Sequence, residues 1–301
     1  MAAEGGNIVR FTYTGADGEV IPDEATHILV QAEVIRRNAF RDHRNIVEVV
    51  CHDRVEKIEA SAFLWCPSLR RVIMRGGKIV EQCAFEDCTA LEYVECDKLE
   101  IIGGFAFNWC GSLRNINLPL ARIVQRGAFR SCNALTDVKF GNKLERIEEE
   151  VFDGCYNLFG ITIPLKDGLF TEDDIFKYCR FLYRVDLIEG ELHETIAALH
   201  LDEWRNDMNE EVDLIRQILP HRDRREKAQA IRRWIRSVLR KIIHYQAEHH
   251  RLLEGDVATM LQCELPVAFS QDIVMNNVLP FLELPSYTFE VGRDEHDNND
   301  E

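Results

Sequence analysis

Apolar residues recur along the first two thirds of the chain with a period of 22 to 24 residues. Each unit follows the pattern small-Phe-x-x-Cys-x-x-Leu-x-x-Val, and four of its positions run in register down the chain. A period of this length predicts stacked repeats, because one unit is too short to bury its own apolar side chains. The four columns are Phe40, Phe63, Phe85, Phe107, Phe129, Phe152 and Phe176; Cys66, Cys88, Cys110, Cys132, Cys155 and Cys179; Leu69, Leu91, Leu113, Leu135, Leu158 and Leu182; and Val72, Val94, Ile116, Val138, Ile161 and Val185.

Each unit contains the pattern of one strand and one tight segment. The Leu-x-x-Val stretch, with another apolar residue two positions later, predicts a short β-strand with one inward face. The Phe and the Cys lie about one helical turn apart, which predicts the inward side of a short helical or 3₁₀ segment. A further apolar pair, such as Leu99 and Ile102, leads into the next unit. The predicted fold class is an α/β repeat solenoid with a parallel strand ladder, at roughly 5 Å per coil.

These residues resemble the BspA-type leucine-rich repeat, whose units have this length and carry the small-Phe-x-x-Cys-x-x-Leu signature. The resemblance covers about residues 35–187 and implies a binding scaffold. Two units depart from the pattern: His43 replaces the cysteine in the first, and Ile175 precedes Phe176 in the last. Terminal repeats commonly differ in this way, because they cap the stack.

The solenoid is predicted to span 34–189, with about seven units, between two other regions. Residues 1–33 contain two short apolar stretches around a Gly15 to Gly18 turn, which predicts a β-hairpin that covers the exposed edge of the first coil. Residues 190–254 change to a period of 3.6 and predict an antiparallel helical hairpin with its turn after Pro220. A short helical segment is expected at 255–285, and an acidic disordered tail at 286–301.

The second helix of the hairpin, predicted at 224–253, carries an unbroken apolar seam typical of a coiled coil. This seam also makes the hairpin a candidate for homodimer formation. Its members are Ala228, Ile231, Ile235, Val238, Ile242, Tyr245, His249 and Leu252.

Charge changes the picture in one place. The 301 residues carry 36 Lys and Arg against 52 Asp and Glu, a net charge of −16 that argues against nucleic acid or an anionic membrane as a general partner. The charge is uneven, however: 191–219 has a net charge of −6 and 220–251 of +7. A basic stripe on the second helix is therefore a candidate contact for nucleic acid or another helix, or simply a solvated face beside the acidic helix. It comprises Arg225, Arg232, Arg233, Arg236 and Arg240.

Ten cysteines invite a metal or disulfide interpretation, but their spacing favours packing. The six cysteines of the column recur once per unit, so each is expected to lie beside the equivalent cysteine of the next coil. Zinc ligands instead come in pairs two to four residues apart. The N-terminus lacks the pattern of a signal peptide, and no apolar run has the length of a membrane span. We therefore expect an intracellular, reducing compartment and no secretion. No metal site, cofactor site or catalytic motif is predicted, so the chain is expected not to be an enzyme.

Residues 265–282 loosely resemble the opening of an F-box, the adaptor-binding helices of some ubiquitin ligase receptors. The spacing from Leu265 to Ile273 is longer than that pattern expects. A helix that docks on the hairpin is the simpler interpretation of this segment.

The candidate binding residues lie on the outward face of the strand ladder, where side chains vary while the core columns do not. We expect a protein partner to bind this face; the alternative is an adaptor or regulator that acts through its basic helix. Two tryptophans that precede ladder cysteines, Trp65 and Trp109, are candidate hot spots. The strand-face residues are Arg71, Ile73, Tyr93, Glu95, Asn115, Asn117, Asp137, Lys139, Thr162 and Arg184.

Overall fold

A computed structural model describes residues 8–166, 168–188, 201–222, 226–241 and 244. The chain divides into two compact units, and residues 209–239 belong to the same unit as the repeats. Several predicted features lie outside the described residues: the segments 255–285 and 286–301, the F-box-like stretch, Arg225, and the members of the apolar seam after Val238. No described helix is both long and apolar enough to cross a membrane.

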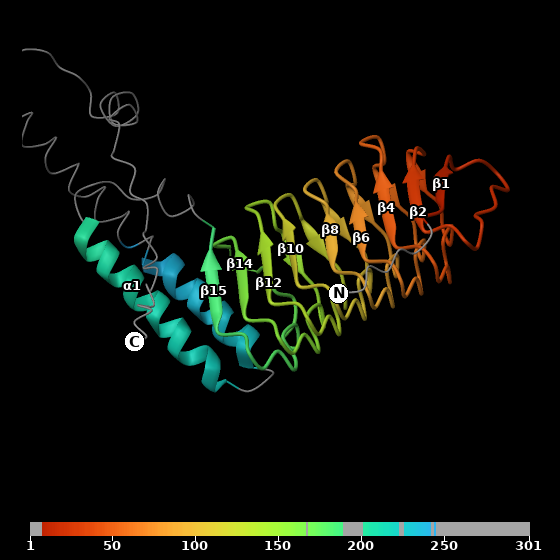
Figure 1. Ribbon diagram of the computed structural model, residues 1–301. Coiled ribbons are helices and arrows are strands. Elements are labelled where there is room, and N and C mark those ends of the chain that lie inside the picture. The colour runs from red at the N-terminus through yellow and green to blue at the C-terminus, as the bar shows by residue number, and fades with distance from the viewer. Residues whose placement is uncertain (1–7, 167, 189–200, 223–225, 242–243, 245–301) are drawn as a thin grey trace, which may run out of the picture. The chain divides into compact units, whose positions relative to one another are not determined.

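The principal ladder is built from one parallel strand per coil, and Figure 1 shows these strands in succession. Its hydrogen-bonded order divides between β8 and β10 into a five-stranded and a four-stranded sheet. The parallel register places Ile28 and Val49 in line with Val72, and both are buried. The predicted column of inward Val and Ile side chains therefore begins two strands earlier than expected. The strands are β1 (Arg10–Tyr13), β2 (His27–Val30), β4 (Glu48–Cys51), β6 (Arg71–Ile73), β8 (Tyr93–Glu95), β10 (Asn115–Leu118), β12 (Asp137–Phe140), β14 (Gly160–Ile163) and β15 (Arg184–Leu187).

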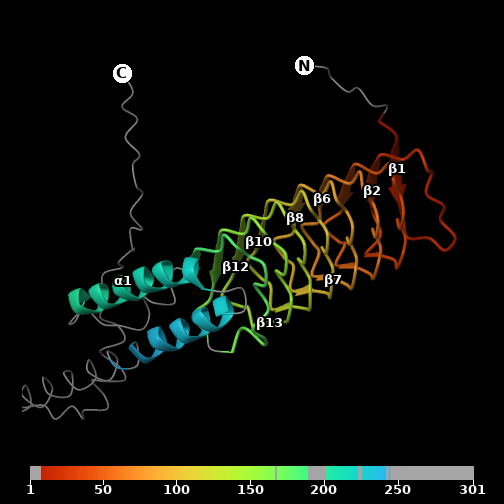
Figure 2. The same cartoon turned by 90° about the horizontal axis from the view of Figure 1, so that it is seen from below.

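A second parallel sheet runs along the coils, formed by the apolar pairs that the sequence indicated only as connections. It has six two-residue strands, two of which are labelled in Figure 2. Each pair buries its second residue, such as Ile58 or Ile102, while the first is half-buried in five strands and exposed in β13. Two residues are too few to show an alternating pattern, so periodicity alone misses these strands. They are β3 (Val34–Ile35), β5 (Lys57–Ile58), β7 (Ile79–Val80), β9 (Ile101–Ile102), β11 (Ile123–Val124) and β13 (Arg146–Ile147).

The small-Phe-x-x-Cys segment forms consecutive turns, where a short helical or 3₁₀ segment was expected. The reason lies in the backbone: two positions in each of the first six coils, and one in the last, have positive φ, which a right-handed helix excludes. One precedes the small residue, and the other precedes the cysteine. The first column is Asn38, Ser61, Cys83, Phe105, Gly127 and Glu150; the second is Asp42, Trp65, Asp87, Trp109, Ser131, Gly154 and Tyr178.

The seven phenylalanines form one stack through the core. Neighbouring ring centroids lie 4.8 to 5.8 Å apart with interplanar angles of 1° to 8°. Tyr13 tilts against Phe40 at one end, and Phe170 meets Phe176 edge-on at the other. Each ring is buried, which contributes about 1.5–3 kcal/mol per residue by area alone. The ring spacing also measures the distance from one coil to the next.

The cysteine column has a specific role beside this stack. Each ladder thiol donates to the carbonyl of the phenylalanine in the preceding coil, at 3.0 to 3.2 Å. In the first unit, the His43 ring nitrogen Nε2 lies 3.0 Å from the Pro22 carbonyl, so the histidine takes the place of the thiol. Burial raises the pKa of the Cys132 thiol to about 12, which keeps this donor protonated. The nine described cysteines are free, as the packing interpretation requires.

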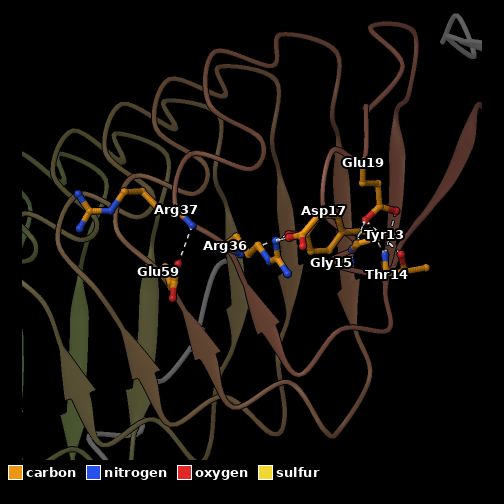
Figure 3. Close-up of polar contacts among 9 residues, drawn as sticks. Tyr13, Thr14, Gly15, Asp17, Glu19, Arg36, Arg37 and Glu59 are labelled. Atoms are coloured by element: carbon orange, nitrogen blue, oxygen red, sulfur yellow. Dashed lines mark hydrogen bonds and ion pairs between the residues drawn. The ribbon is translucent and has the colours of Figure 1, made fainter.

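The predicted N-terminal hairpin is wrong. β1 pairs with β2 in parallel, so it is the first rung of the ladder and β2 begins the repeats before residue 34. The segment between them is a loop that Glu19 closes: its carboxylate accepts from the backbone N–H groups of Thr14, Gly15 and Ala16 (Figure 3). These internal acceptors stabilise a compact loop, whereas the sequence pattern suggested a second strand.

Two helices follow the solenoid: α1 (Leu201–Ile218), extended by the 3₁₀ turn η2 (Leu219–His221), and a helix over 226–241. The second helix covers the last coil. Lys227, which is 3 % exposed, donates to the carbonyls of Arg180 and Leu182 at 3.2 and 3.0 Å. Burial lowers the pKa of the Lys227 ammonium. The seam residues Ala228, Ile231, Ile235 and Val238 are already buried within a single chain. Homodimer formation through the hairpin stays a prediction.

Candidate functional site

The strand face consists of two outward columns that the parallel register aligns. One column runs His27, Glu48, Arg71 and Tyr93, and the other Leu29, Val50, Ile73 and Glu95. On the second sheet the columns continue through Asn115, Asp137, Gly160 and Arg184, and through Asn117, Lys139, Thr162 and Asp186. The ten predicted strand-face residues therefore lie on one surface in each sheet. His27, Leu29, Glu48 and Val50 were missed, because neither His27–Val30 nor Glu48–Cys51 alternates between apolar and polar residues in a way that shows which side chains face outward.

Arg71 and Tyr93 form the centre of the N-terminal part of this face. The Arg71 guanidinium lies 5.4 Å from the centroid of the Tyr93 ring, within the range of a cation–π contact. Its Nη1 also lies 3.7 Å from the Glu48 carboxylate on the neighbouring strand. The Tyr93 side chain remains 45 % exposed. An aromatic ring held in place by an arginine, and still accessible, is a suitable interface anchor.

Apolar side chains border this pair. Leu29 is 44 % exposed, and Val50 and Ile73 follow it in register as half-buried residues. Glu95 ends the column and pairs with Arg75, whose hydrogen bond lowers the pKa of the Glu95 carboxyl. We call Leu29, Val50, Ile73, Arg71 and Tyr93 the rung patch.

At the C-terminal end, Asp137 and Arg184 are paired with each other. They lie two strands apart, on either side of Gly160, and form an ion pair across it. A Cβ at Gly160 would lie 2.6 Å from the nearest atoms of both side chains, so only glycine leaves the path open. Arg184 Nε also lies 2.9 Å from Asp186. This part of the face is polar and internally compensated, with exposed Asn115, Asn117 and Lys139 and a half-buried Thr162.

An aromatic cluster near the last coil was not predicted. Phe159 and Phe181 each meet Tyr183 at near right angles, with centroids 6.0 and 6.2 Å apart. Both phenylalanines stay more than 40 % exposed, and Arg184 lies over the Phe159 ring at 5.5 Å. The sequence carries a signal for this cluster at the residue that directly precedes each strand. This residue is polar from Arg70 through Thr136 and aromatic in the last two coils, at Phe159 and Tyr183.

The two predicted tryptophans lie on a different face, on the turns that precede the ladder cysteines. Trp65 and Trp109 are 57 % and 50 % exposed. The indole Nε1 of Trp65 donates to the Asp87 carboxylate on the next coil at 2.9 Å. This hydrogen bond directs the Trp65 ring toward the neighbouring coil. Burial of the Asp87 carboxyl raises its pKa.

The described members of the predicted basic stripe differ in burial and contacts. Arg232 is half-buried and pairs with Asp173, and its Nη1 donates to the carbonyls of Phe170 and Glu172 at 3.5 and 3.4 Å. These contacts fasten the second helix to the last coil. Arg233, Arg236 and Arg240 are exposed, so three of the four described members of the stripe face solvent.

Between α1 and the second helix lies a cavity of about 250 Å³. Leu214, Ile218 and Trp234 form its apolar walls, and the Ser237 hydroxyl donates to Glu211 at its border. The described residues contain no cluster of three His, Cys, Asp or Glu side chains that could hold a metal ion.

Comparison with known proteins agrees with this architecture. The model of the BspA type leucine rich repeat region matches residues 24–124 and 72–183, in six copies. This chain belongs to the BspA-type leucine-rich repeat family. The match begins inside β2's coil, in agreement with a repeat array that starts before residue 34. No curated protein matches the chain.

Solved structures similar to this BspA-type protein include a leucine-rich repeat protein from Bacteroides ovatus, with 24 % identity, a TM-score of 0.44 and coverage of 61 % of this chain and 43 % of that one. The leucine-rich repeat protein of T. pallidum has 24 % identity, a TM-score of 0.38 and coverage of 60 % and 70 %. A leucine-rich cell surface protein from Faecalibacterium prausnitzii has 17 % identity, a TM-score of 0.21 and coverage of 56 % and 80 %. This chain thus spans under half the length of the B. ovatus protein.

Leucine-rich repeat proteins of the BspA type belong to a class that is generally used for binding and is typically non-catalytic. Rigid stacked coils present many side chains in fixed register, which suits recognition over an extended surface.

Proposed function

We propose that this BspA-type protein is a non-catalytic scaffold that binds a protein partner through the rung patch of its strand ladder. The contact between Arg71 and Tyr93 carries the proposal, because it holds an exposed ring in a defined position beside an apolar column. Interface hot spots are enriched in tyrosine and arginine at the centre of such patches. The C-terminal part of the face is a weaker candidate, because its Asp137 and Arg184 already satisfy each other.

The experiment that tests this function compares two double variants of the full chain. Arg71→Ala with Tyr93→Ala removes the centre of the rung patch. Arg54→Ala with Tyr156→Ala removes the same residue types from exposed positions outside the strand ladder. Partners are recovered from native cells by proximity labelling and identified by mass spectrometry.

We expect the first variant to lose specific partners that the wild type and the second variant retain. Thermal unfolding should be little changed in both, since the residues are exposed. Equal recovery by all three proteins would overturn the strand face as the binding surface.

The alternative partner, nucleic acid, is disfavoured by the use of Arg232 in fastening the second helix. A gel shift of the full chain at low and high salt separates the two functions. Contacts with phosphates weaken steeply as salt rises, and a shift with that behaviour would favour the basic helix.

The free, buried cysteines support a further part of the proposal, namely residence in a reducing compartment. Alkylation of the protein under denaturing conditions, directly from its native source, should label every cysteine. A protein recovered with intact disulfides would contradict this location.

A further inference from the structure

The turn column that contains Trp65 and Trp109 has a backbone that does not favour tryptophan. All seven of its members have φ between 58° and 76°, the left-handed region. Side chains that tolerate this conformation best are small or polar, and four of the seven members are of this kind: Asp42, Asp87, Ser131 and Gly154. The other three, Trp65, Trp109 and Tyr178, are aromatic. Since the fold is satisfied by those residues, the bulk of the two tryptophans is not required by the turn. Unusual residues at strained positions point to a role in recognition.

The two indoles lie on alternate coils, and an acidic residue lies between them. The phenylalanine stack gives coil spacings of 5.1 and 5.2 Å at this point, so the backbones of Trp65 and Trp109 lie about 10 Å apart. Asp87 occupies the intervening position and accepts the hydrogen bond from Trp65. Glu86, its neighbour, is held by the Asn108 side-chain amide at 2.8 Å. The surface therefore combines two half-exposed aromatic rings with two carboxylates.

The same column shows what such a ring attracts. In the last coil the aromatic member is Tyr178, and the Lys177 ammonium lies 5.5 Å from its ring centroid. The residues that correspond to Lys177 beside the tryptophans are Leu64 and Asn108, which carry no charge. In the part of the chain that the structure describes, no cation lies over the ring of either tryptophan.

We propose that Trp65, Asp87 and Trp109 form a second binding surface, which takes basic side chains of a protein partner. A guanidinium or ammonium group over an indole gains cation–π attraction, and the neighbouring carboxylates add charge complementarity. This surface is separate from the rung patch. It does not depend on the proposed function, because its test uses a defined ligand and different residues.

The test uses the full-length protein and a peptide with two arginines separated by two glycines. Residues three apart in an extended chain are about 10 Å apart, which matches the spacing of the two indoles. The control peptide carries citrulline in place of arginine, which keeps a planar group of nearly the same size but replaces one NH2 donor with a carbonyl oxygen and removes the charge. Binding is followed by the indole N–H resonances in NMR spectra, assigned with Trp65→Phe and Trp109→Phe.

We expect saturable shifts of the Trp65 and Trp109 resonances with the arginine peptide, and at least about threefold weaker binding of the citrulline peptide. Higher salt should weaken binding of the arginine peptide. Asp87→Asn keeps an oxygen for the Trp65 hydrogen bond and removes the charge, so it should weaken binding without unfolding the turn. Trp109→Leu should abolish the shift at Trp65 or reduce it strongly, whereas Tyr156→Leu, an exposed aromatic outside this surface, should leave it unchanged.

Several results would overturn the proposal: equal binding of the two peptides, no saturable shift, or full binding by Asp87→Asn. Circular dichroism and thermal unfolding identify any variant that fails to fold, and Asp87→Asn provides the decisive comparison if Trp109→Leu does so.

Discussion

Asp137 and Arg184 form an ion pair although a whole coil separates them in the ladder. Gly160 lies between them in register and makes the pair possible, because its missing side chain leaves the space through which the two groups meet. The outward face of a solenoid is thus shaped by contacts over two coils as well as between neighbours.

Gly160→Ala should therefore break this pair. The readout is the coupling energy between Asp137→Asn and Arg184→Gln, measured by chemical denaturation in a double-mutant cycle. We expect about 0.2–1 kcal/mol in the wild type, typical of partly exposed pairs, and close to zero when residue 160 is alanine. Gly111→Ala is the matched control, because a Cβ there meets nothing within 4 Å. A coupling energy that survives in Gly160→Ala would show that the glycine is not what permits the pair.

The buried thiols predict a loss of stability in alkaline solution. Burial raises the pKa of Cys132 to about 12 in the folded chain, whereas an unfolded cysteine titrates near about 8.5. At a pH above the pKa of the unfolded cysteine, the unfolded state loses a proton that the folded state keeps. The contribution of the thiol to stability is therefore complete below the unfolded pKa and is lost as the pH rises toward the folded pKa.

Cys132→Ala isolates this effect. Its destabilisation relative to the wild type should be smaller at pH 9.5 than at pH 7, by about 1.4 kcal/mol. Urea denaturation at the two pH values measures this difference. If Cys132→Ala destabilised the protein equally at both pH values, the pKa of the folded thiol would not be raised.

The cap provides a comparison between adjacent arginines. Arg232 contacts Asp173 and two backbone carbonyls of the last coil, whereas Arg233 is exposed. Arg232→Gln should lower the free energy of unfolding by about 1.5–3 kcal/mol, the range for hydrogen bonds to charged groups. Arg233→Gln should change it by less than about 0.5 kcal/mol. Equal effects in equilibrium denaturation would show that Arg232 does not fasten the helix.

Sequence reasoning succeeded best where the environment repeats. Every coil offers a ring position such as Phe107 and a thiol position such as Cys110 nearly the same surroundings, so the same residue types recur and the columns are visible. It failed where local signals were short or ambiguous. The two-residue strands of the second sheet carry no period, and the loop that Glu19 closes has the composition of a hairpin turn.

The sequence by itself therefore determined the repeat length, the inward columns, the family resemblance and the presence of two terminal helices. Only the tertiary structure decided which outward residues meet. Arg71 lies over Tyr93, Trp65 reaches Asp87, Asp137 meets Arg184, and Arg232 is taken into the cap. The physical reason is that inward positions are constrained by burial, which leaves a period in the sequence. Outward partners lie a coil or more apart, and only the stacking register brings them together.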